Sequence, residues 1–203
     1  MSSEHYFSKD PVGDFKPKQI KVQLAGNSYE VTTAGGIFSP DGIDKGTAVL
    51  LAHIDAAPRG GNLLDLGCGW GPIALSLALR APQAVVWAVD VNQRSLELTR
   101  ANAAALGLTN VRVCTPEEVP ADLTFDGIWS NPPIRVGKAV LHEIMQAWLP
   151  RLSSGASAYL VVQKNLGSDS LQRWLSEVMP KSYETGRVDT EKSFRVLRVW
   201  NRG

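Results

Sequence analysis

The stretch Asp65-Leu66-Gly67-Cys68-Gly69-Trp70-Gly71 is the most informative part of this sequence. It follows the apolar pair Leu63-Leu64 and leads into an apolar run from Pro72 to Leu79, which is the order of a strand, a tight glycine turn and a helix start. Glycine permits positive φ and a close approach of a ligand to the backbone, and Pro72 suits the first turn of a helix. We therefore predict a nucleotide-binding turn, with an ordinary strand-to-helix turn as the alternative.

A carboxylate further along the chain favours ligand binding. A second apolar run ends at Asp90, about 20 residues beyond the glycines, where a doubly wound sheet places an acidic side chain against ribose hydroxyls. A dinucleotide fingerprint is Gly-x-Gly-x-x-Gly, but here Gly71 comes one position early and Pro72 stands at the last glycine position, so NAD is disfavoured. The pattern Gly-x-Gly-x-Gly after an Asp resembles motif I of class I S-adenosylmethionine-dependent methyltransferases.

Composition narrows the class of protein. The 203 residues carry a net charge of +1 and are 44% hydrophobic, which is typical of one soluble domain. No apolar run approaches the ~20 residues of a membrane span and the N-terminus has no signal-peptide core, so we expect a cytoplasmic protein without membrane association. Cys68 and Cys114 are expected to be reduced. The spacing of His5, His53 and His142 is not that of metal ligands, and we predict no metal.

The chain is expected to form one domain with two parts, an N-terminal appendage over residues 1–55 and a core over residues 56–203. Residues 20–24 and 29–33 alternate in hydrophobicity, and Gly26-Asn27 lies between them, which predicts a small β-hairpin. Helical spacing predicts a helix over residues 47–54 that leads into the core.

The core alternates strands and helices, which indicates an α/β fold with a Rossmann-like, mostly parallel doubly wound sheet. Expected strands cover 62–66, 85–90, 111–114, 125–130 and 158–163, and expected helices cover 72–80, 93–106, 138–152 and 168–178. Two further strands, near 183–188 and 194–200, are expected to pair antiparallel at the C-terminal edge of the sheet. Ligands bind beyond the C-terminal ends of parallel strands, where the glycine turn and Asp90 are predicted to lie.

A second chemical motif, Ser130-Asn131-Pro132-Pro133, directly follows the fourth expected strand. A double proline makes a stiff, extended loop at the ligand edge of the sheet. An amine conjugated to a ring or carbonyl is a poor nucleophile because its lone pair is delocalised. The Asn131 side-chain oxygen and the Pro132 carbonyl, held in place beforehand, can accept its N–H groups and direct the lone pair at a methyl sulfonium. The alternative is a proline-rich turn with Asn131 as a local cap.

Together, Asp65 to Gly71, Asp90 and Asn131-Pro132-Pro133 resemble the amino-group methyltransferases with an Asn/Asp-Pro-Pro-aromatic motif. Ile134 departs from that pattern, since adenine-N6 and protein-glutamine enzymes usually carry Tyr or Phe there. Residues 130–138, with His5-Tyr6-Phe7-Ser8, Gly36-Ile37-Phe38-Ser39 and Asp44-Lys45-Gly46-Thr47, are similar to the small-subunit ribosomal RNA guanine-N2 methyltransferases. The similarity spans nearly the whole chain. The chain resembles the single catalytic unit of that family, and the extra N-terminal domain that long members carry is absent from this sequence.

The resemblance implies how S-adenosylmethionine would be held. Gly67, Gly69 and Gly71 would pass under its methionine part, and Asp90 would hold its ribose. Asp65 would orient the turn or the cofactor ammonium.

Further cofactor contacts are implied beyond the next two strands. Asn92 would flank the adenosine or, alternatively, cap the following helix. Glu117 would lie near the adenine amino group or in a solvated loop. The implied cofactor set is Asp65, Gly67, Cys68, Gly69, Gly71, Asp90, Val91, Asn92, Glu117 and Asn131, and the implied catalytic set is Asn131, Pro132 and Pro133.

Substrate contacts are predicted around the same loop. Arg135 and Lys138 flank it and would meet RNA phosphates, unless they are ordinary solvated charges. Because Ile134 replaces an aromatic residue, base stacking has to come from elsewhere. Phe7, Tyr6 and Phe38 are candidates, unless they pack the appendage against the core.

We therefore expect a class I methyltransferase that transfers a methyl group from S-adenosylmethionine to guanine N2 of ribosomal RNA, with ribosomal RNA or the small ribosomal subunit as its partner. A second interpretation changes the acceptor to adenine N6, a protein glutamine or a small amine, and Ile134 disfavours the first two. A third is a cofactor-binding scaffold for RNA or assembly without turnover, which the intact Asn131-Pro132-Pro133 disfavours. No oligomeric state is predicted.

Overall fold

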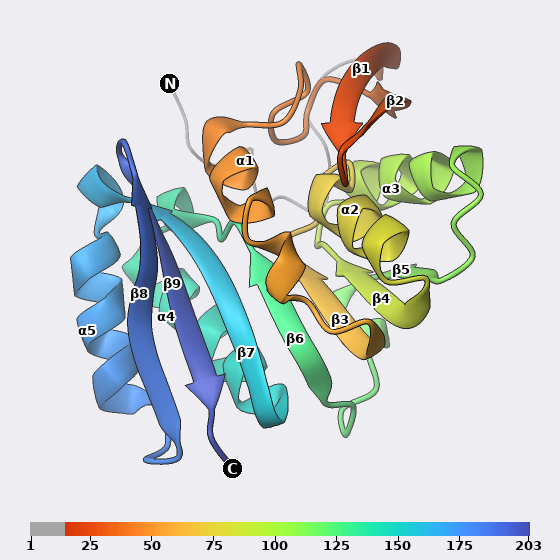
Figure 1. Cartoon of the computed structure of the whole chain (residues 1–203). Coiled ribbons are helices and arrows are strands. Elements are labelled where there is room, and N and C mark those ends of the chain that lie inside the picture. Colours follow the sequence, from red (N-terminus) through yellow and green to blue (C-terminus); the bar gives the residue numbers. More distant parts are fainter. Residues whose placement is uncertain (1–14) are drawn as a thin grey trace.

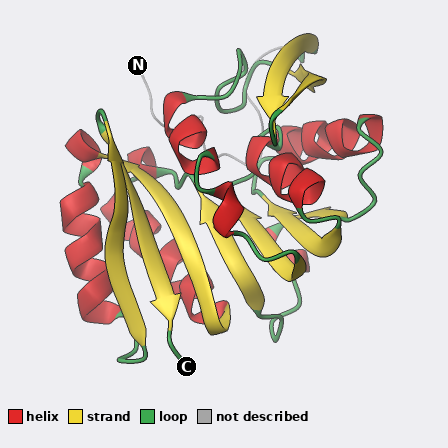
Figure 2. Ribbon diagram, in the orientation of Figure 1, coloured by secondary structure: helices red, strands yellow, loops and turns green. Residues whose placement is uncertain are grey.

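The computed structural model describes residues 15–203, except for the side chain of Arg135, and over these residues it contains a seven-stranded sheet in the order β5-β4-β3-β6-β7-β9-β8. Helices cover both faces of the sheet (Figure 1, Figure 2). The strands are β3 (Gly60–Leu66), β4 (Gln83–Val89), β5 (Val111–Cys114), β6 (Phe125–Ser130), β7 (Leu152–Gln163), β8 (Tyr183–Glu191) and β9 (Phe194–Asn201). The predicted Rossmann-like α/β fold is confirmed.

The directions of the strands define the edge of the sheet at which a ligand would bind. Strands β3 to β7 are parallel, β9 runs antiparallel to β7, and β8 runs antiparallel to β9, which confirms the predicted C-terminal edge. The order of the strands reverses between β3 and β6, which pair through Leu63 with Gly127 and Asp65 with Trp129. In a doubly wound sheet, ligands bind in the crevice at this reversal. The glycine turn and Asn131 follow these two neighbouring strands.

The two faces of the sheet have separate cores because strand side chains alternate between the faces. Leu63 and Val161 pack with α1 (Lys45–Leu51), α2 (Pro72–Arg80) and α3 (Gln93–Ala105) on one face. Leu64, Leu160 and Val162 pack with α4 (Lys138–Trp148) and α5 (Ser168–Val178) on the other face. These near-continuous apolar strands are typical of a parallel sheet that is covered on both sides.

The predicted hairpin consists of β1 (Lys18–Leu24) and β2 (Asn27–Thr33), and it lies over α2 and α3 (Figure 1). Its turn is Ala25-Gly26, and the predicted turn at Gly26-Asn27 is wrong. Ala25 and Gly26 have φ of 47° and 84°, and a two-residue hairpin turn of type I′ needs positive φ at both central positions. Asn27 pairs with Leu24 in the ladder.

Asn102 of α3 attaches the hairpin to the core. Its side-chain amide accepts from Thr32 N at 2.7 Å and donates to Thr32 O at 2.9 Å and to Trp70 O at 3.0 Å. The indole of Trp70 in turn donates to Ser39 O at 3.2 Å. The hairpin, α3 and the glycine turn are thus joined through buried and part-buried hydrogen bonds. The division at residue 55 stays a prediction.

The largest difference from the sequence prediction lies between α4 and β7. The helix that was expected to reach residue 152 ends at Trp148, and a 3-10 turn (Leu149–Arg151) follows. Pro150 in this turn has no N–H to donate and would clash with the preceding helical turn, so the α-helix cannot continue. β7 starts at Leu152, which pairs with Phe125 of β6, and not at residue 158. The residues between 152 and 158 are mostly polar or glycine, so hydrophobicity alone does not indicate a strand in this part of the chain.

Between residues 15 and 203, no helix is both long and apolar enough to span a membrane. The same residues contain no group of three or more His, Cys, Asp or Glu side chains that could hold a metal ion. Cys68 and Cys114 are buried and free. The predictions of no metal and of a cytoplasmic location stay predictions.

Candidate active site

The glycine turn has one open side and one packed side. Gly67, Gly69 and Gly71 have φ of 83°, 58° and 99°, a region that glycine adopts without strain. A Cβ at Gly67 or Gly69 would meet no atom within 4 Å, whereas a Cβ at Gly71 would lie 3.1 Å from Thr99. A ligand can therefore approach the backbone at Gly67 and Gly69, while Gly71 allows α2 and α3 to pack closely.

Asp90 follows β4 and holds the glycine turn from the neighbouring strand. Its Oδ2 accepts from Gly69 N at 2.9 Å, and its Oδ1 accepts from Asn92 N at 2.9 Å. Burial raises the pKa of Asp90, and these backbone N–H groups oppose the rise. The structure thus brings the predicted ribose-binding carboxylate to the glycine turn. It also shows a second role that the sequence analysis missed, because Asp90 orders the backbone of the turn.

Asn92 is the N-cap of α3, which was the alternative given for it. Its side-chain oxygen accepts from Arg94 N at 3.0 Å and from Ser95 N at 3.3 Å. Its NH2 donates to Gly36 O at 3.3 Å, which ties α3 to the loop before Phe38. Val91, between Asp90 and Asn92, is half-buried.

Asp65 is a buried carboxylate with an unused oxygen. Its Oδ2 accepts from Ala74 N at 2.8 Å, and its Oδ1 has no hydrogen-bond partner among the described residues. Burial raises the pKa of Asp65 to about 8; the Ala74 N–H opposes the rise and the charge of Asp90 adds to it. Buried polar atoms normally have partners, so an ammonium group beside this oxygen would supply one and would favour the ionised form of Asp65.

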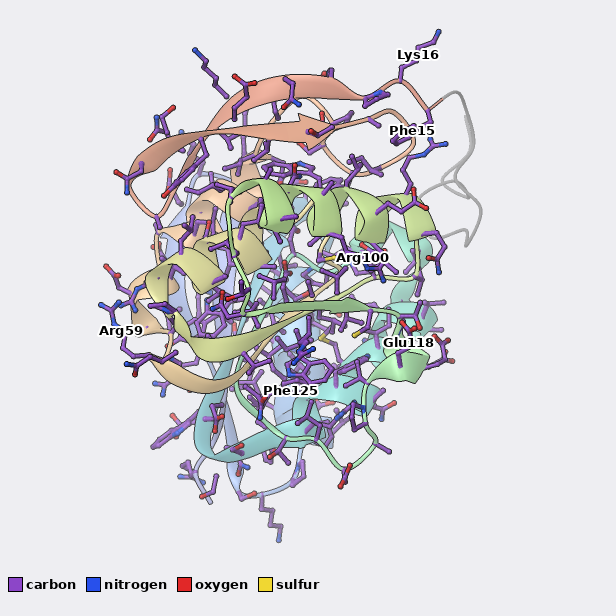
Figure 3. All side chains as sticks on the ribbon, turned by 90° about the vertical axis from the view of Figure 1, so that its right-hand side faces the viewer. Phe15, Lys16, Arg59, Arg100, Glu118 and Phe125 are labelled. Carbon is purple, nitrogen blue, oxygen red and sulfur yellow. The ribbon has the colours of Figure 1, made fainter. Side chains whose placement is uncertain are left out.

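Cys68 and Glu117 have different surroundings from the other predicted cofactor residues. Burial raises the pKa of the Cys68 thiol well above its usual range, so it stays neutral at physiological pH and is no nucleophile. Glu117 is exposed on the 3-10 helix Pro116–Glu118 after β5. Glu118, labelled in Figure 3, accepts from Thr115 N at 2.7 Å and caps this short helix. Glu117 shares the sheet edge with Asp90 but does not line the pocket described next.

The glycine turn, the segment before and within α1, and Asn131 surround one pocket. It is partly open to solvent and encloses a volume of only about 20 Å³. Phe38 and Ser39 line one side, and Asp44 and Thr47 at the start of α1 line another. The structure therefore brings together Phe38, the glycine turn and Asn131, and the roles predicted for them stay predictions. Asp44 and Thr47 were missed as site residues, although their segment belongs to the sequence resemblance.

Asn131 has a defined orientation at this pocket. Its Nδ2 donates to Asp44 Oδ2 at 3.1 Å and to Thr47 Oγ1 at 3.0 Å. Its Oδ1 accepts no hydrogen bond from the described part of the chain. The side chain thus presents an acceptor and keeps its donors turned toward α1.

The two prolines form a tight and largely buried turn. The Pro132 carbonyl accepts from Ile134 N at 2.9 Å, and Pro133 has φ −76° and ψ 69°, the geometry of an inverse γ-turn. The Pro133 carbonyl accepts from Val136 N at 3.1 Å. A carbonyl has two lone pairs, so Pro132 keeps one for a second donor. The sequence predicted an extended loop, but the structure has a tight turn here, and the Pro132 carbonyl is shared with the backbone. The predicted stiffness stays a prediction.

The predicted substrate residues lie in different places around this loop. Ile134 is half-buried against the core under α4, and Lys138 is exposed at the first residue of α4. Both also line a second hollow, between the starts of α4 and α5. Phe38 is 39% exposed at the first pocket. The Arg135 side chain and all of Tyr6 and Phe7 lie outside the described part of the structure.

Several known proteins have sequences similar to this chain. The family model of the methyltransferase small domain matches residues 28–198. The uncharacterized protein YbxB of Bacillus subtilis is 32% identical over 97% of this chain and 98% of its own length. Ribosomal RNA small subunit methyltransferase C of Stutzerimonas stutzeri is 32% identical over 71% of this chain, and the match spans only 43% of that protein.

A solved structure has the same fold. The Thermus thermophilus 16S rRNA N2 G1207 methyltransferase (RsmC), solved with AdoMet and guanosine, superposes on 95% of this chain and 52% of its own chain with a TM-score of 0.80 and 23% identity. An open glycine backbone and an unpaired buried carboxylate oxygen fit the cofactor of such enzymes. The chain belongs to the methyltransferase small domain family, whose cofactor is S-adenosylmethionine, and this confirms the family and cofactor predicted from the sequence.

Proposed function

We propose that this protein transfers a methyl group from S-adenosylmethionine to guanine N2 of ribosomal RNA. The orientation of Asn131 carries the proposal: its NH2 faces Asp44 and Thr47, so its Oδ1 is left to accept an N–H at a pocket that the glycine turn also lines. The similarity to curated small-subunit ribosomal RNA methyltransferases supports RNA as the substrate. The chain spans less than half the length of those relatives, so their substrate is part of the proposal.

The acceptor side of the site, formed by Asn131 and Pro132, would prepare the amine for methylation. The guanine amino group is a weak nucleophile because its lone pair is delocalised into the ring. Asn131 Oδ1 and the free lone pair of the Pro132 carbonyl would accept its N–H groups and hold the nitrogen lone pair away from conjugation. Both acceptors are fixed before the substrate arrives, which makes such groups effective. The bound cofactor supplies a methyl group on a positively charged sulfur.

The glycine side of the site, formed by the glycine turn with Asp65 and Asp90, would hold the cofactor. We assign the backbone at Gly67 and Gly69 to the methionine part, the unpaired Oδ1 of Asp65 to its ammonium, and Asp90 to the ribose. Asp90 has to combine this contact with its bond to Gly69 N. Cys68, Gly71, Val91 and Asn92 are assigned to the walls of this side and not to the reaction. Glu117, which does not line the pocket, is assigned to the adenine amino group of the cofactor.

RNA would approach from the side of α4. Lys138 and Arg135 are assigned to phosphate contacts, and Phe38, Phe7 and Ile134 to contacts with the target base. The partner is then ribosomal RNA, free or in the small subunit, which places the protein in the cytoplasm. Adenine N6, a protein glutamine and a small amine are the competing acceptors, and the non-aromatic Ile134 disfavours the first two.

The test is transfer of labelled methyl from S-adenosylmethionine to small subunits, large subunits, naked ribosomal RNA and total protein, all prepared from cells that lack this gene. Removing the gene matters because a substrate that is already methylated accepts no label. Labelled RNA is then digested to nucleosides and separated. We expect N2-methylguanosine in RNA of the small subunit, and none when Asn131→Ala replaces the wild type.

Two outcomes would overturn the proposal. Label in another nucleoside or in protein would change the acceptor while keeping the chemistry. No label in any preparation, with cofactor still bound, would favour a scaffold without turnover.

A further inference from the structure

Asp44 is at once the N-cap of α1 and a partner of Asn131. Its Oδ1 accepts from Gly46 N at 2.9 Å, and its Oδ2 accepts from Thr47 N at 3.3 Å and from Asn131 Nδ2 at 3.1 Å. The buried hydroxyl of Thr47 accepts from the same Nδ2 at 3.0 Å. The NH2 of Asn131 therefore has two acceptors, and both belong to the start of α1.

The orientation of this amide determines what the pocket offers to a substrate. Rotating the Asn131 amide by half a turn exchanges its oxygen and its NH2 with almost no change in shape. With the oxygen in the pocket, it accepts an N–H from an amine, whereas the NH2 would place a donor against a donor. A carboxylate has only acceptors, so Asp44 accepts one of these two orientations and rejects the other.

We propose that Asp44 is a positioning residue for methyl transfer, which sets the acceptor orientation of Asn131, with Thr47 as the second acceptor. The inference rests on the proposed function, because that function assigns Asn131 Oδ1 to the amine. Asp44 itself needs no contact with substrate or cofactor in this role. The role explains why a segment more than 80 residues earlier in the chain lines the pocket.

An exchange of the two side chains tests the proposal. Asp44→Asn keeps an oxygen for the cap of α1 but turns an NH2 toward Asn131, so the Asn131 amide should rotate and kcat should fall about 100-fold. Asn131→Asp places two carboxylates against each other, and kcat should fall by a similar factor of about 100. In the double variant, the amide introduced at position 44 donates to one oxygen of the carboxylate introduced at position 131, and the other oxygen faces the pocket. Its kcat should exceed that of either single variant by at least about tenfold.

Thr47 and Asp41 provide matched comparisons. Thr47→Val removes one acceptor at constant shape and should lower kcat about fivefold, while Thr47→Ser keeps the hydroxyl and should recover most of the loss. Asp41→Asn removes a nearby surface carboxylate that pairs with Lys18 and has no contact with Asn131. Its kcat should stay within about twofold of the wild type.

A readout without turnover separates this inference from the proposed function. In ¹⁵N-labelled, cofactor-free protein, the side-chain NH2 signal of Asn131 is identified by its loss in Asn131→Asp. It should move strongly in Asp44→Asn and little in Asp41→Asn, while cofactor affinity and melting temperature stay close to the wild type in both variants. If the wild type methylates no RNA but this shift is seen, the proposed function fails and the orientation by Asp44 stands.

Two results would overturn the inference. The first is a double variant whose kcat equals the product of the two single losses, because Asp44 and Asn131 would then act independently. The second is an unchanged Asn131 NH2 signal in Asp44→Asn, because the amide would then keep its orientation without the carboxylate.

Discussion

The glycine turn after β3 and the Asn131-Pro132-Pro133 loop after β6 follow neighbouring strands, but they are held in different ways. The glycine turn is held by its own backbone conformation, by Asp90, which is 21 residues from Gly69, and by Asn102, which donates to Trp70 O over 32 residues. Asn131 is held by Asp44 and Thr47, which are 87 and 84 residues away in the chain. The glycine side is therefore held by contacts over 21 and 32 residues of chain, whereas the acceptor side depends on the docking of α1.

This difference implies that the two sides of the pocket can fail separately. Changes on the glycine side should weaken cofactor binding and leave the rate at saturating cofactor nearly intact. Changes on the Asn131 side should lower the rate and leave cofactor affinity intact. The following predictions test this separation.

The largest effect is expected from Asn131→Ala. Loss of the preorganised acceptor should lower kcat about 100- to 1000-fold. The dissociation constant of S-adenosylmethionine, measured by calorimetry, should change by less than about twofold because the glycine side is untouched. A parallel loss of cofactor affinity would show that Asn131 also binds the cofactor and that the two sides are not separable.

The buried carboxylate of Asp65 predicts a pH dependence of stability. Its pKa is about 8 in the folded chain, above the ordinary value of 3.8, so between these values the folded state keeps a proton that the unfolded state has lost. The free energy of unfolding of the cofactor-free protein should therefore fall as pH rises through this range, by up to ~1.4 kcal/mol per pH unit. Asp90, whose pKa is also raised, adds to the slope.

Asp65→Asn should flatten this dependence, since the amide keeps an oxygen for Ala74 N and cannot ionise. Urea unfolding between pH 5 and pH 8 measures the slope for both proteins. The variant should also bind cofactor more weakly, with kcat at saturation nearly unchanged. Equal slopes in the two proteins would contradict the assignment of the raised pKa to Asp65.

A smaller effect is expected from Gly69→Ala, with Gly107→Ala as its control. Gly69 and Gly107 have φ of 58° and 67°, and an added Cβ meets no atom within 4 Å at either position. Both variants should therefore lose about 1 kcal/mol of stability through the left-handed backbone alone. Only at Gly69 does the methyl enter the open side of the turn, so only Gly69→Ala should weaken cofactor binding, about tenfold. Equal cofactor affinities would place the cofactor elsewhere.

The smallest effect is expected from Lys138→Gln. A surface phosphate contact contributes about one counterion to the salt dependence of RNA binding, so the affinity for RNA should fall a few-fold and the salt slope by roughly 0.7. Lys181→Gln is the control, because Lys181 is exposed before β8, at the opposite end of the sheet. Fluorescence anisotropy at several salt concentrations measures both. If the two variants have the same salt slope, the start of α4 does not contact RNA.

Much of the fold was predictable because the sequence patterns that indicate its helices, strands and turns each extend over only a few neighbouring residues. Hydrophobic periodicity located α2, α5, β5 and β6, and Gly107 marked the end of α3. The start of β7 was missed because polar residues interrupt its pattern, and only pairing with Phe125 defines it as a strand. The hairpin turn was shifted by one residue because Gly-Asn and Ala-Gly compete locally, and the ladder register decides between them.

The site divides in the same way. Local sequence was sufficient for the glycine turn, for Asp90 and for the proline loop, because backbone conformation and strand order place residues that follow strands at one edge of the sheet. The contact of Asp44 and Thr47 with Asn131 was decided by tertiary structure alone, as was the unpaired oxygen of Asp65. Hydrogen bonds between distant segments, and the burial that removes water from a carboxylate, depend on packing in three dimensions, and no local pattern of residues records them.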